Sequence, residues 1–253
     1  MSGRTAGYQR WANLTFLHWR VPVDVLQRQL PAGLEVDTYA GEAWLGVVPF
    51  SMERVRPWWS PPVPGISWFL ETNVRTYVRG PGGVPGVWFF SLDANQRLAV
   101  ELARRIWNLP YFRAELALSD REERTGGELL LHVDYAGWRI EQPAGDYKIG
   151  ITADASNPQP AVAGTLEHFL VERYVLFCVD ARHRLYSGRV HHVPYRICPV
   201  LTQRVEQTLT GSVTSGLECP GPAEHAAWSP GVDVRISPLE RCDWDLAQSE
   251  YSG

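Results

Sequence analysis

The sequence of 253 residues lacks the segments that mark membrane and secreted proteins. It contains no run of about 18 or more apolar residues, which is the length that a membrane-spanning helix needs. Its first residues, MSGRTAGYQRWANLTF, have no apolar stretch behind a basic one, so no secretory signal is expected. These absences predict a soluble, cytoplasmic protein without a membrane partner.

Lysine is almost absent, and this absence restricts the chemistry. Of the 24 cationic side chains, 23 are arginine and only Lys148 is lysine. Imine formation needs a primary amine that can lose its proton, which a guanidinium group cannot do near neutral pH. Lys148 alternates with Tyr147 and Ile149 in the stretch GDYKIG, so it is expected to face solvent. An imine mechanism therefore has no well-placed amine.

Metal-binding and cofactor-binding patterns are also missing. The four cysteines form no CxxC pair and are expected to stay reduced, and the adjacent His191 and His192 would point to opposite sides of a strand. GxSxG, P-loop, GxGxxG and HExxH motifs are absent. The net charge of −4 and the scattered cations argue against nucleic acid. No metal, no cofactor and no nucleic-acid partner are expected.

Alternation of apolar and polar residues predicts about ten strands and three short helices. With turns every 8 to 15 residues and no βαβ rhythm, this pattern predicts a single α+β domain that is mainly antiparallel β, built as a barrel or a curled sheet. Helices are expected over residues 22–30, 93–108 with Asp93 as its cap, and 165–173.

One predicted strand, residues 71–78, carries the first candidate site. Glu71, Asn73 and Arg75 share one face of this strand by period-two counting. The neighbouring stretches LTFLHW, AWLGVVPF and GVWFFSL are apolar, which places the strand deep in the sheet. A buried carboxylate needs a partner, and Arg75 is a candidate. The face could meet solvent, or it could line a cavity as an ion pair or as a catalytic pair.

Two further segments supply candidate ligand contacts. His18 and Arg20 share a strand face in FLHWR and could bind an anion, although His18 could equally be a hydrogen-bonded core residue. The segment 56–68, RPWWSPPVPGISW, has four prolines and three tryptophans, which predicts a loop with a large apolar area. The loop, with Trp68, would be a lid over a ligand or an interface in a homo-oligomer.

Several stretches together resemble a known family: FLHWRVPVDVLQRQLPAGLEVDTYAGEAWLGVVPF, ETNVRTYVRG, GVWFFSLDANQRLAVELARRIWNLPYFRAEL, LYSGRVHHVPY and SPGVDVRISPLERC. They resemble the uncharacterised YqjF-like family of bacterial proteins, a distant branch of the acetoacetate decarboxylase-like superfamily. The resemblance covers about residues 11–241. It implies one domain over 1–253, folded as a cone-shaped β-barrel around a central cavity with a few outer helices.

The resemblance also implies where a site lies. In the decarboxylases, an arginine in a YRTDP-like stretch, a glutamate opening a central strand and a lysine pair in a GYPKK-like stretch build the site. Arg20 and Glu71 fall at the arginine and the glutamate, whereas Tyr111 and Phe112 stand where the lysines would be. Since neither side chain can form an imine, no acetoacetate decarboxylase activity is expected.

The leading hypothesis is a protein that keeps the superfamily's cavity and uses it on a small anionic or carbonyl-bearing molecule. If the protein is an enzyme, a lyase-like or isomerase-like reaction on a keto acid without an imine is expected. Glu71 would be the general base and Tyr111 the hydroxyl donor, while Arg20 and Arg75 would hold the anion. The other expected ligand contacts are His18, Asn73 and Trp68. The alternative is a non-enzymatic sensor or carrier whose aromatic side chains bind a hydrophobic small molecule.

Overall fold

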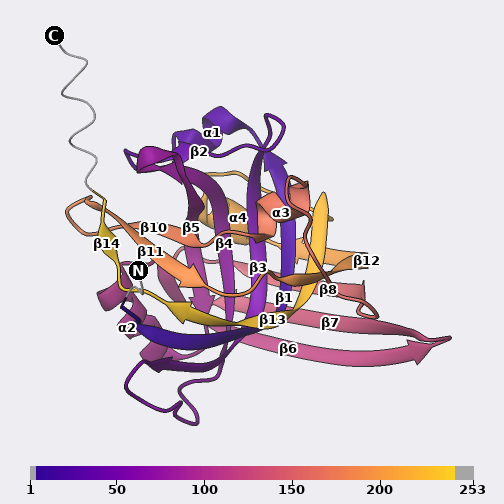
Figure 1. The fold of residues 1–253 in the computed structure, drawn as a ribbon. Helices are drawn as coiled ribbons and strands as arrows, with labels where there is room; N and C mark the ends of the chain where they lie inside the picture. Colours follow the sequence, from indigo (N-terminus) through magenta and orange to yellow (C-terminus); the bar gives the residue numbers. More distant parts are fainter. Residues whose placement is uncertain (1–3, 243–253) are drawn as a thin grey trace.

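A computed structural model describes residues 4–242, so both ends of the predicted 1–253 domain lie outside the described range. The chain is mostly β-structure with a few helices, as predicted (Figure 1). The described strands are β1 (Gly7–Val21), β2 (Glu35–Val36), β3 (Ala43–Pro57), β4 (Phe69–Gly80), β5 (Val84–Ala94), β6 (Tyr111–Thr125), β7 (Glu128–Arg139), β8 (Asp146–Asp154), β9 (Gln159–Pro160), β10 (Val175–Val179), β11 (Leu185–His191), β12 (Arg196–Gln207), β13 (His225–Ile236) and β14 (Glu240–Arg241).

The described α-helices are α1 (Val23–Gln27), α2 (Arg97–Trp107), α3 (Leu166–Val171) and α4 (Leu209–Val213). The prediction that Asp93 caps α2 is wrong. The helix begins later because the side chain of Gln96 accepts a hydrogen bond from the backbone N–H of Leu98, and Asp93 belongs to β5. Helix α4 was not predicted, because the apolar pattern of β12 runs directly into it.

The strands form one sheet in the order β14, β11, β10, β5, β6, β7, β8, β12, β13, β1, β3, β4, β2. An additional pairing between β4 and β5 links the sheet back on itself, so a ring of pairings runs from β5 through β6 and round to β4. Most pairings are antiparallel, but β5 pairs in parallel with β6 and with β10. The unit β5–α2–β6 is therefore a βαβ crossover that the sequence did not predict. The cone shape of a barrel stays a prediction.

Strand β4 lies between β3 and β5, and both of its faces are buried. Side chains such as Val74 face one core cluster, which also contains Leu17 and Ile149. The opposite face of the neighbouring strands meets a second cluster, in which Phe50 contributes from β3 and Val100 from α2. The polar face that begins at Glu71 is therefore in the interior, which excludes the solvent-facing alternative.

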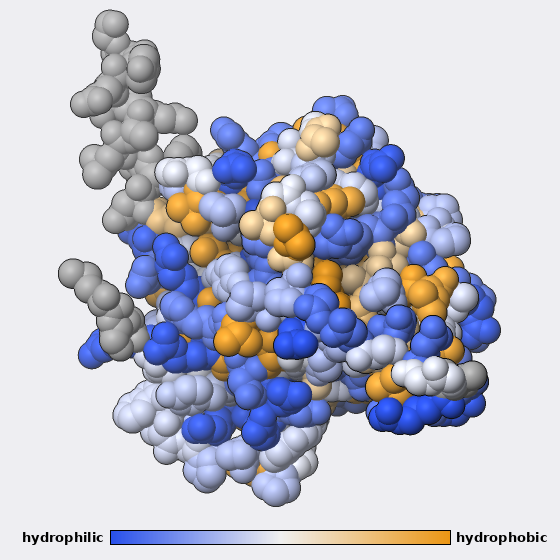
Figure 2. Space-filling model, turned by 45° about the vertical axis from the view of Figure 1, so that its right-hand side comes forward, coloured by the Kyte–Doolittle hydropathy of each residue, from blue (hydrophilic) through white to orange (hydrophobic). Residues whose placement is uncertain are grey.

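The surface is mixed in character. On the face that Figure 2 shows, hydrophobic residues are scattered among hydrophilic ones and form no single large patch. Lys148 is exposed on β8 between the buried Tyr147 and Ile149, as predicted. Cys178, Cys198 and Cys219 are buried and form no disulfide. Among the described residues, no helix is long and apolar enough to cross a membrane.

Candidate functional site

A glutamate and a tyrosine meet in the interior from two strands, β4 and β6, that both pair with β5. Glu71 is the third residue of β4 and is 3% exposed, and Tyr111 is the first residue of β6. The Tyr111 hydroxyl donates a hydrogen bond of 2.8 Å to Oε2 of Glu71. Glu71 lies opposite Phe50 on β3 and Ala94 on β5, so its other contacts within the sheet are apolar. The pair joins the two positions that the resemblance singled out at the glutamate and at the lost lysine.

Helix α2 fixes the position of Tyr111. The chain leaves β5, forms α2, and returns as β6 so that Tyr111 lies beside Leu92. The Nε of Arg104, on α2, donates to the backbone carbonyl of Tyr111 at 2.8 Å, and the Arg104 guanidinium also pairs with Glu141. Because the helix holds the main chain at this point, the phenol has one well-defined direction toward Glu71.

Burial changes the acidity of both groups. Loss of water raises the pKa of Glu71 from 4.5 to about 8; the Tyr111 hydrogen bond works against this, and the charge of Asp93 adds to it. Burial and the neighbouring carboxyl raise the pKa of Tyr111 well above its usual value. At neutral pH the phenol is therefore a hydrogen-bond donor, and Glu71 titrates close to neutrality. A carboxyl with such a pKa can give and take protons near physiological pH.

The stability of the protein is expected to fall between about pH 4.5 and pH 8. The pKa of Glu71 is higher in the folded protein than its ordinary value, so the folded state binds this proton more tightly than the unfolded chain does. The resulting stabilisation is complete below the ordinary pKa and decreases as the pH rises through the folded pKa, by up to roughly 4 kcal/mol.

Urea unfolding of the wild type and of Glu71→Gln at several pH values measures this effect. The wild type is expected to lose more stability than the variant on going from mildly acidic to mildly alkaline buffer. Burial also raises the pKa of Asp93, to about 6, but this group is present in both proteins and its effect cancels in the comparison. Equal losses in the two proteins would contradict the burial of an ionisable Glu71.

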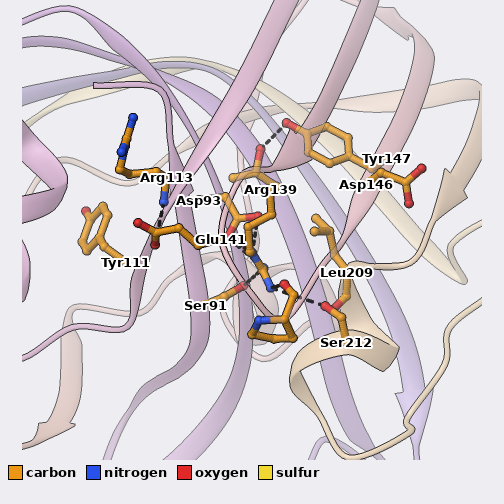
Figure 3. A network of polar contacts seen from close by, with 12 residues as sticks. Ser91, Asp93, Tyr111, Arg113, Arg139, Glu141, Asp146, Tyr147, Leu209 and Ser212 are labelled. Carbon is orange, nitrogen blue, oxygen red and sulfur yellow. Dashed lines mark hydrogen bonds and ion pairs between the residues drawn. The ribbon is translucent and has the colours of Figure 1, made fainter. Parts of the chain in front are cut away.

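Beside this pair lies a buried ion pair (Figure 3). Nη2 of Arg139, at the end of β7, lies 2.8 Å from Oδ1 of Asp93, and its Nε lies 3.1 Å from both carboxylate oxygens. The remaining Arg139 donors reach Ser91 Oγ, the carbonyl of Pro143 and Ser212 Oγ. Since every N–H of the guanidinium has a partner, this arginine stabilises the sheet and has no donor left for a ligand.

Sequence reasoning missed the pair of Asp93 and Arg139. A signal was present, because the inward-facing positions of β7 follow each other with period two through Leu131, Val133 and Tyr135 and reach Arg139. An arginine at the end of such a series must have a buried partner. Which residue is that partner depends on the register of the sheet, and the sequence does not show the register.

Asn73 and Arg75 follow Glu71 along the same polar face of β4. Asn73 is buried, and its Oδ1 has no hydrogen-bond partner among the described residues. A bulge precedes Arg75, whose Nη2 donates to the carbonyl of Leu170 at 3.1 Å, while its Nε has no partner in the described part of the chain. Within residues 4–242 Glu71 forms no ion pair, so Arg75 is not the partner of its carboxyl.

His18 is a fully buried member of a hydrogen-bonded chain. The Tyr77 hydroxyl donates to the carbonyl of Leu170, so it accepts from Nε2–H of His18 at 2.7 Å. Nδ1 of His18 then accepts from Nδ1–H of His225 at 3.0 Å. Burial, His225 and Arg75 hold the pKa of His18 well below its usual value. Both ring nitrogens are occupied, which favours the core-residue interpretation of His18.

Arg20 and Trp68 lie apart from the Glu71 pair. Arg20 pairs with Trp44 on β3, and Glu71 pairs with Phe50, so six residues of β3, roughly 20 Å, separate them along the sheet. The Arg20 side chain is 54% exposed and forms an ion pair with Glu224. Trp68 is exposed at the end of the loop. The structure therefore brings together Glu71 and Tyr111 but neither Arg20 nor Trp68.

A metal centre has no ligand set in residues 4–242, where no three His, Cys, Asp or Glu side chains cluster. Lysine chemistry is equally remote from the pair, because Lys148 is exposed on β8. The chemistry that the pair itself can perform is proton transfer between a carboxyl of near-neutral pKa and a bound molecule, with a phenol that donates a hydrogen bond.

Solved structures of the same architecture belong to acetoacetate decarboxylases and related enzymes. An acetoacetate decarboxylase-like enzyme from Sphingomonas wittichii RW1 is 14% identical, with a TM-score of 0.64 over 95% of this chain and 94% of that chain. The acetoacetate decarboxylase of Legionella pneumophila is 12% identical, with a TM-score of 0.57 over 96% and 90%. The enduracididine biosynthesis enzyme MppR, complexed with pyruvate, is 13% identical, with a TM-score of 0.61 over 94% and 91%. These similarities establish an acetoacetate decarboxylase-like fold.

The chain belongs to the DUF2071 family, described as an uncharacterized conserved protein, whose profile matches residues 8–233. The uncharacterized protein YqjF of Bacillus subtilis (strain 168) is 34% identical over 233 residues, which are 92% of this chain and 91% of that protein. The predicted membership in the YqjF-like family is thereby confirmed, and the solved structures confirm that the chain has an acetoacetate decarboxylase-like fold.

Proposed function

We propose that this protein binds a small keto acid beside Glu71 and Tyr111 and catalyses proton transfer next to the carbonyl group without an imine. The hydrogen bond between the two side chains, at the positions of the superfamily's glutamate and lysine, is the observation that carries the proposal. That a relative of the same fold, MppR, is known in complex with pyruvate supports a keto acid as the ligand class.

Each of the two side chains would have a different role in enolisation. The carboxylate form of Glu71 takes a proton from the carbon next to the carbonyl. The single hydroxyl proton of Tyr111, which is donated to Glu71 in the free protein, would turn to the oxygen on which negative charge develops. Returning the proton to the carbon completes an exchange, and returning it to the oxygen gives the enol isomer. Where the next carbon carries a hydroxyl group, its loss as water, with the proton that Glu71 has taken, makes the reaction a dehydration. Since the pKa of Glu71 is about 8, the active carboxylate becomes more abundant as the pH rises toward that value.

The carboxylate of the keto acid would lie along the polar face of β4. Side chains two residues apart on one strand face are about 7 Å apart, which is the length of a short keto acid. Asn73 lies at that distance from Glu71, and the unpaired Nε–H of Arg75 lies beyond it. The guanidinium N–H can donate to a carboxylate, and the side-chain NH2 of Asn73 can do so too, whereas the unpartnered Oδ1 of Asn73 can only accept. This placement uses Asn73 and Arg75 but not Arg20.

Exchange of the methyl protons of pyruvate with deuterated water tests the proposal. The wild type is expected to accelerate loss of the methyl signal in proton NMR, with a rate that rises up to about pH 8. The same sample should release no acetone from acetoacetate, and borohydride should trap no covalent adduct, because Tyr111 cannot form an imine.

Two outcomes would count against an enzyme of this kind. Trapping of an adduct on Lys148 or on the N-terminus would show that an imine is used after all. Saturable quenching of tryptophan fluorescence by a keto acid, with no exchange at any pH, would support the alternative of a binding protein.

A further inference from the structure

Helix α2 carries an apolar ridge on its outer side. Leu98, Leu102 and Ile106 are 55–59% exposed, whereas Val100 on the inner side is fully buried. The three exposed side chains are four residues apart, so they form one row about 12 Å long. In Figure 1 the helix lies outside the strands at the edge of the molecule. Such a row on a helix in water usually marks a contact surface.

The exposed tryptophan loop lies at the N-terminal end of this ridge. The side chain of Gln96 donates to the carbonyl of Gly65, and the backbone of Asn95 donates to the carbonyl of Leu70. The loop thus extends the apolar surface beyond the helix. Its exposed apolar side chains are Trp58, Trp59, Val63, Ile66 and Trp68.

The charged side chains beside the ridge can form ion pairs with the same side chains of a second copy of the helix. Glu101 and Arg105 lie one residue before and three residues after Leu102, so both are on the same flank. Within the helix they are only loosely paired, with 3.9 Å between Arg105 Nη2 and Glu101 Oε2. If a second α2 packs antiparallel against the first, the same flanks come together in reverse order. Glu101 then faces the partner's Arg105, and Arg105 faces the partner's Glu101.

We infer that a second copy of this chain covers the ridge, with the two α2 helices packed antiparallel about a two-fold axis close to Leu102. Rows of side chains spaced by four residues pack well against each other at about −50°. Two symmetric ion pairs would border the apolar centre, as a two-fold interface requires. The flank carries both Glu101 and Arg105, so it supplies both members of an ion pair to a second copy of itself.

Analytical ultracentrifugation of the full chain at micromolar concentration tests the inference. The wild type is expected to be a dimer, and Leu102→Glu is expected to weaken dimerisation by at least about 100-fold, since two carboxylates would be buried at the axis. Leu201→Glu is the matched control, because Leu201 is an equally exposed leucine on β12 and should leave the dimer unchanged. Both residues are on the surface, and circular dichroism checks that the variants fold.

Charge reversal tests the antiparallel arrangement itself. Glu101→Arg and Arg105→Glu are each expected to weaken the dimer about tenfold, and the double variant is expected to restore it. A monomeric wild type, a dimer that survives Leu102→Glu, or a double variant no better than the single ones would overturn the inference. Binding of a monomer to phosphatidylglycerol vesicles that is lost in Leu102→Glu would assign the ridge to a membrane instead.

Discussion

Glu71→Gln is expected to reduce the proton exchange of pyruvate by a factor between about 100 and 10,000, the usual contribution of a general base. The amide fits the space of the carboxyl and can still accept the hydrogen bond from Tyr111, so the fold should be preserved. What is lost is the group that takes the proton. Initial rates of methyl-signal loss in deuterated buffer, at a pH close to 8, measure the effect.

Tyr111→Phe is the matched variant for the second member of the pair. Removing the phenol is expected to lower the exchange rate by about 100-fold, because the developing oxyanion loses its hydrogen-bond donor. It should also move the midpoint of the pH profile upward, since the Tyr111 hydrogen bond holds the pKa of Glu71 lower than burial alone would set it. Exchange that is unchanged in Glu71→Gln, or a profile unmoved in Tyr111→Phe, would remove the pair from the reaction.

Arg139→Met is expected to lower the free energy of unfolding by about 3–5 kcal/mol, because it leaves Asp93 buried without its partner. Three further polar groups also lose their donor: Ser91, Pro143 and Ser212. Urea denaturation followed by tryptophan fluorescence measures the loss. The loss should be smaller in acidic buffer, where Asp93, whose pKa burial raises to about 6, is protonated.

An exposed ion pair supplies the control for this variant. Arg204 lies 3.9 Å from Asp134 on the surface, so Arg204→Met should change the stability by less than about 1 kcal/mol. The double variant Asp93→Asn, Arg139→Met should recover part of the loss, since it removes the unpaired charge. A loss in Arg139→Met as small as that in Arg204→Met would show that the buried network is not a main support of the sheet.

Period-two alternation correctly predicted a strand with a polar face at Glu71, and the apolar neighbours correctly predicted that this strand lies inside the sheet. The resemblance identified Glu71 and Tyr111 as candidates, and the structure shows them in contact. The strand prediction succeeded because it depends on local pattern, whereas the roles of Glu71 and Tyr111 stay a prediction. The partner of Tyr111 lies 40 residues away in the chain, so only the matching segments could suggest it.

Other features depend on the register between strands and on the residue at which a helix or strand ends. The alternation of apolar and polar residues shows neither. Asp93 stands at the start of the predicted helix, where a cap is expected, yet its carboxylate binds Arg139, 46 residues away. Arg20 fits the family's arginine by position, but the strand carries it to the far end of β3. The helix over 93–108 is predicted from the sequence, whereas the outward direction of its apolar side cannot be deduced from periodicity, which gives a face but not its orientation.

The central claim is that Glu71 is a buried carboxyl, hydrogen-bonded by Tyr111, that exchanges its proton near neutral pH. Titration of carbon-13-labelled glutamate side chains by NMR, in the wild type and in Glu71→Gln, tests it most directly. One carboxyl signal, absent from the variant, is expected to titrate with a pKa of about 8. If the signal lost in the variant titrates close to 4.5 instead, the carboxyl is in contact with water and the account is wrong.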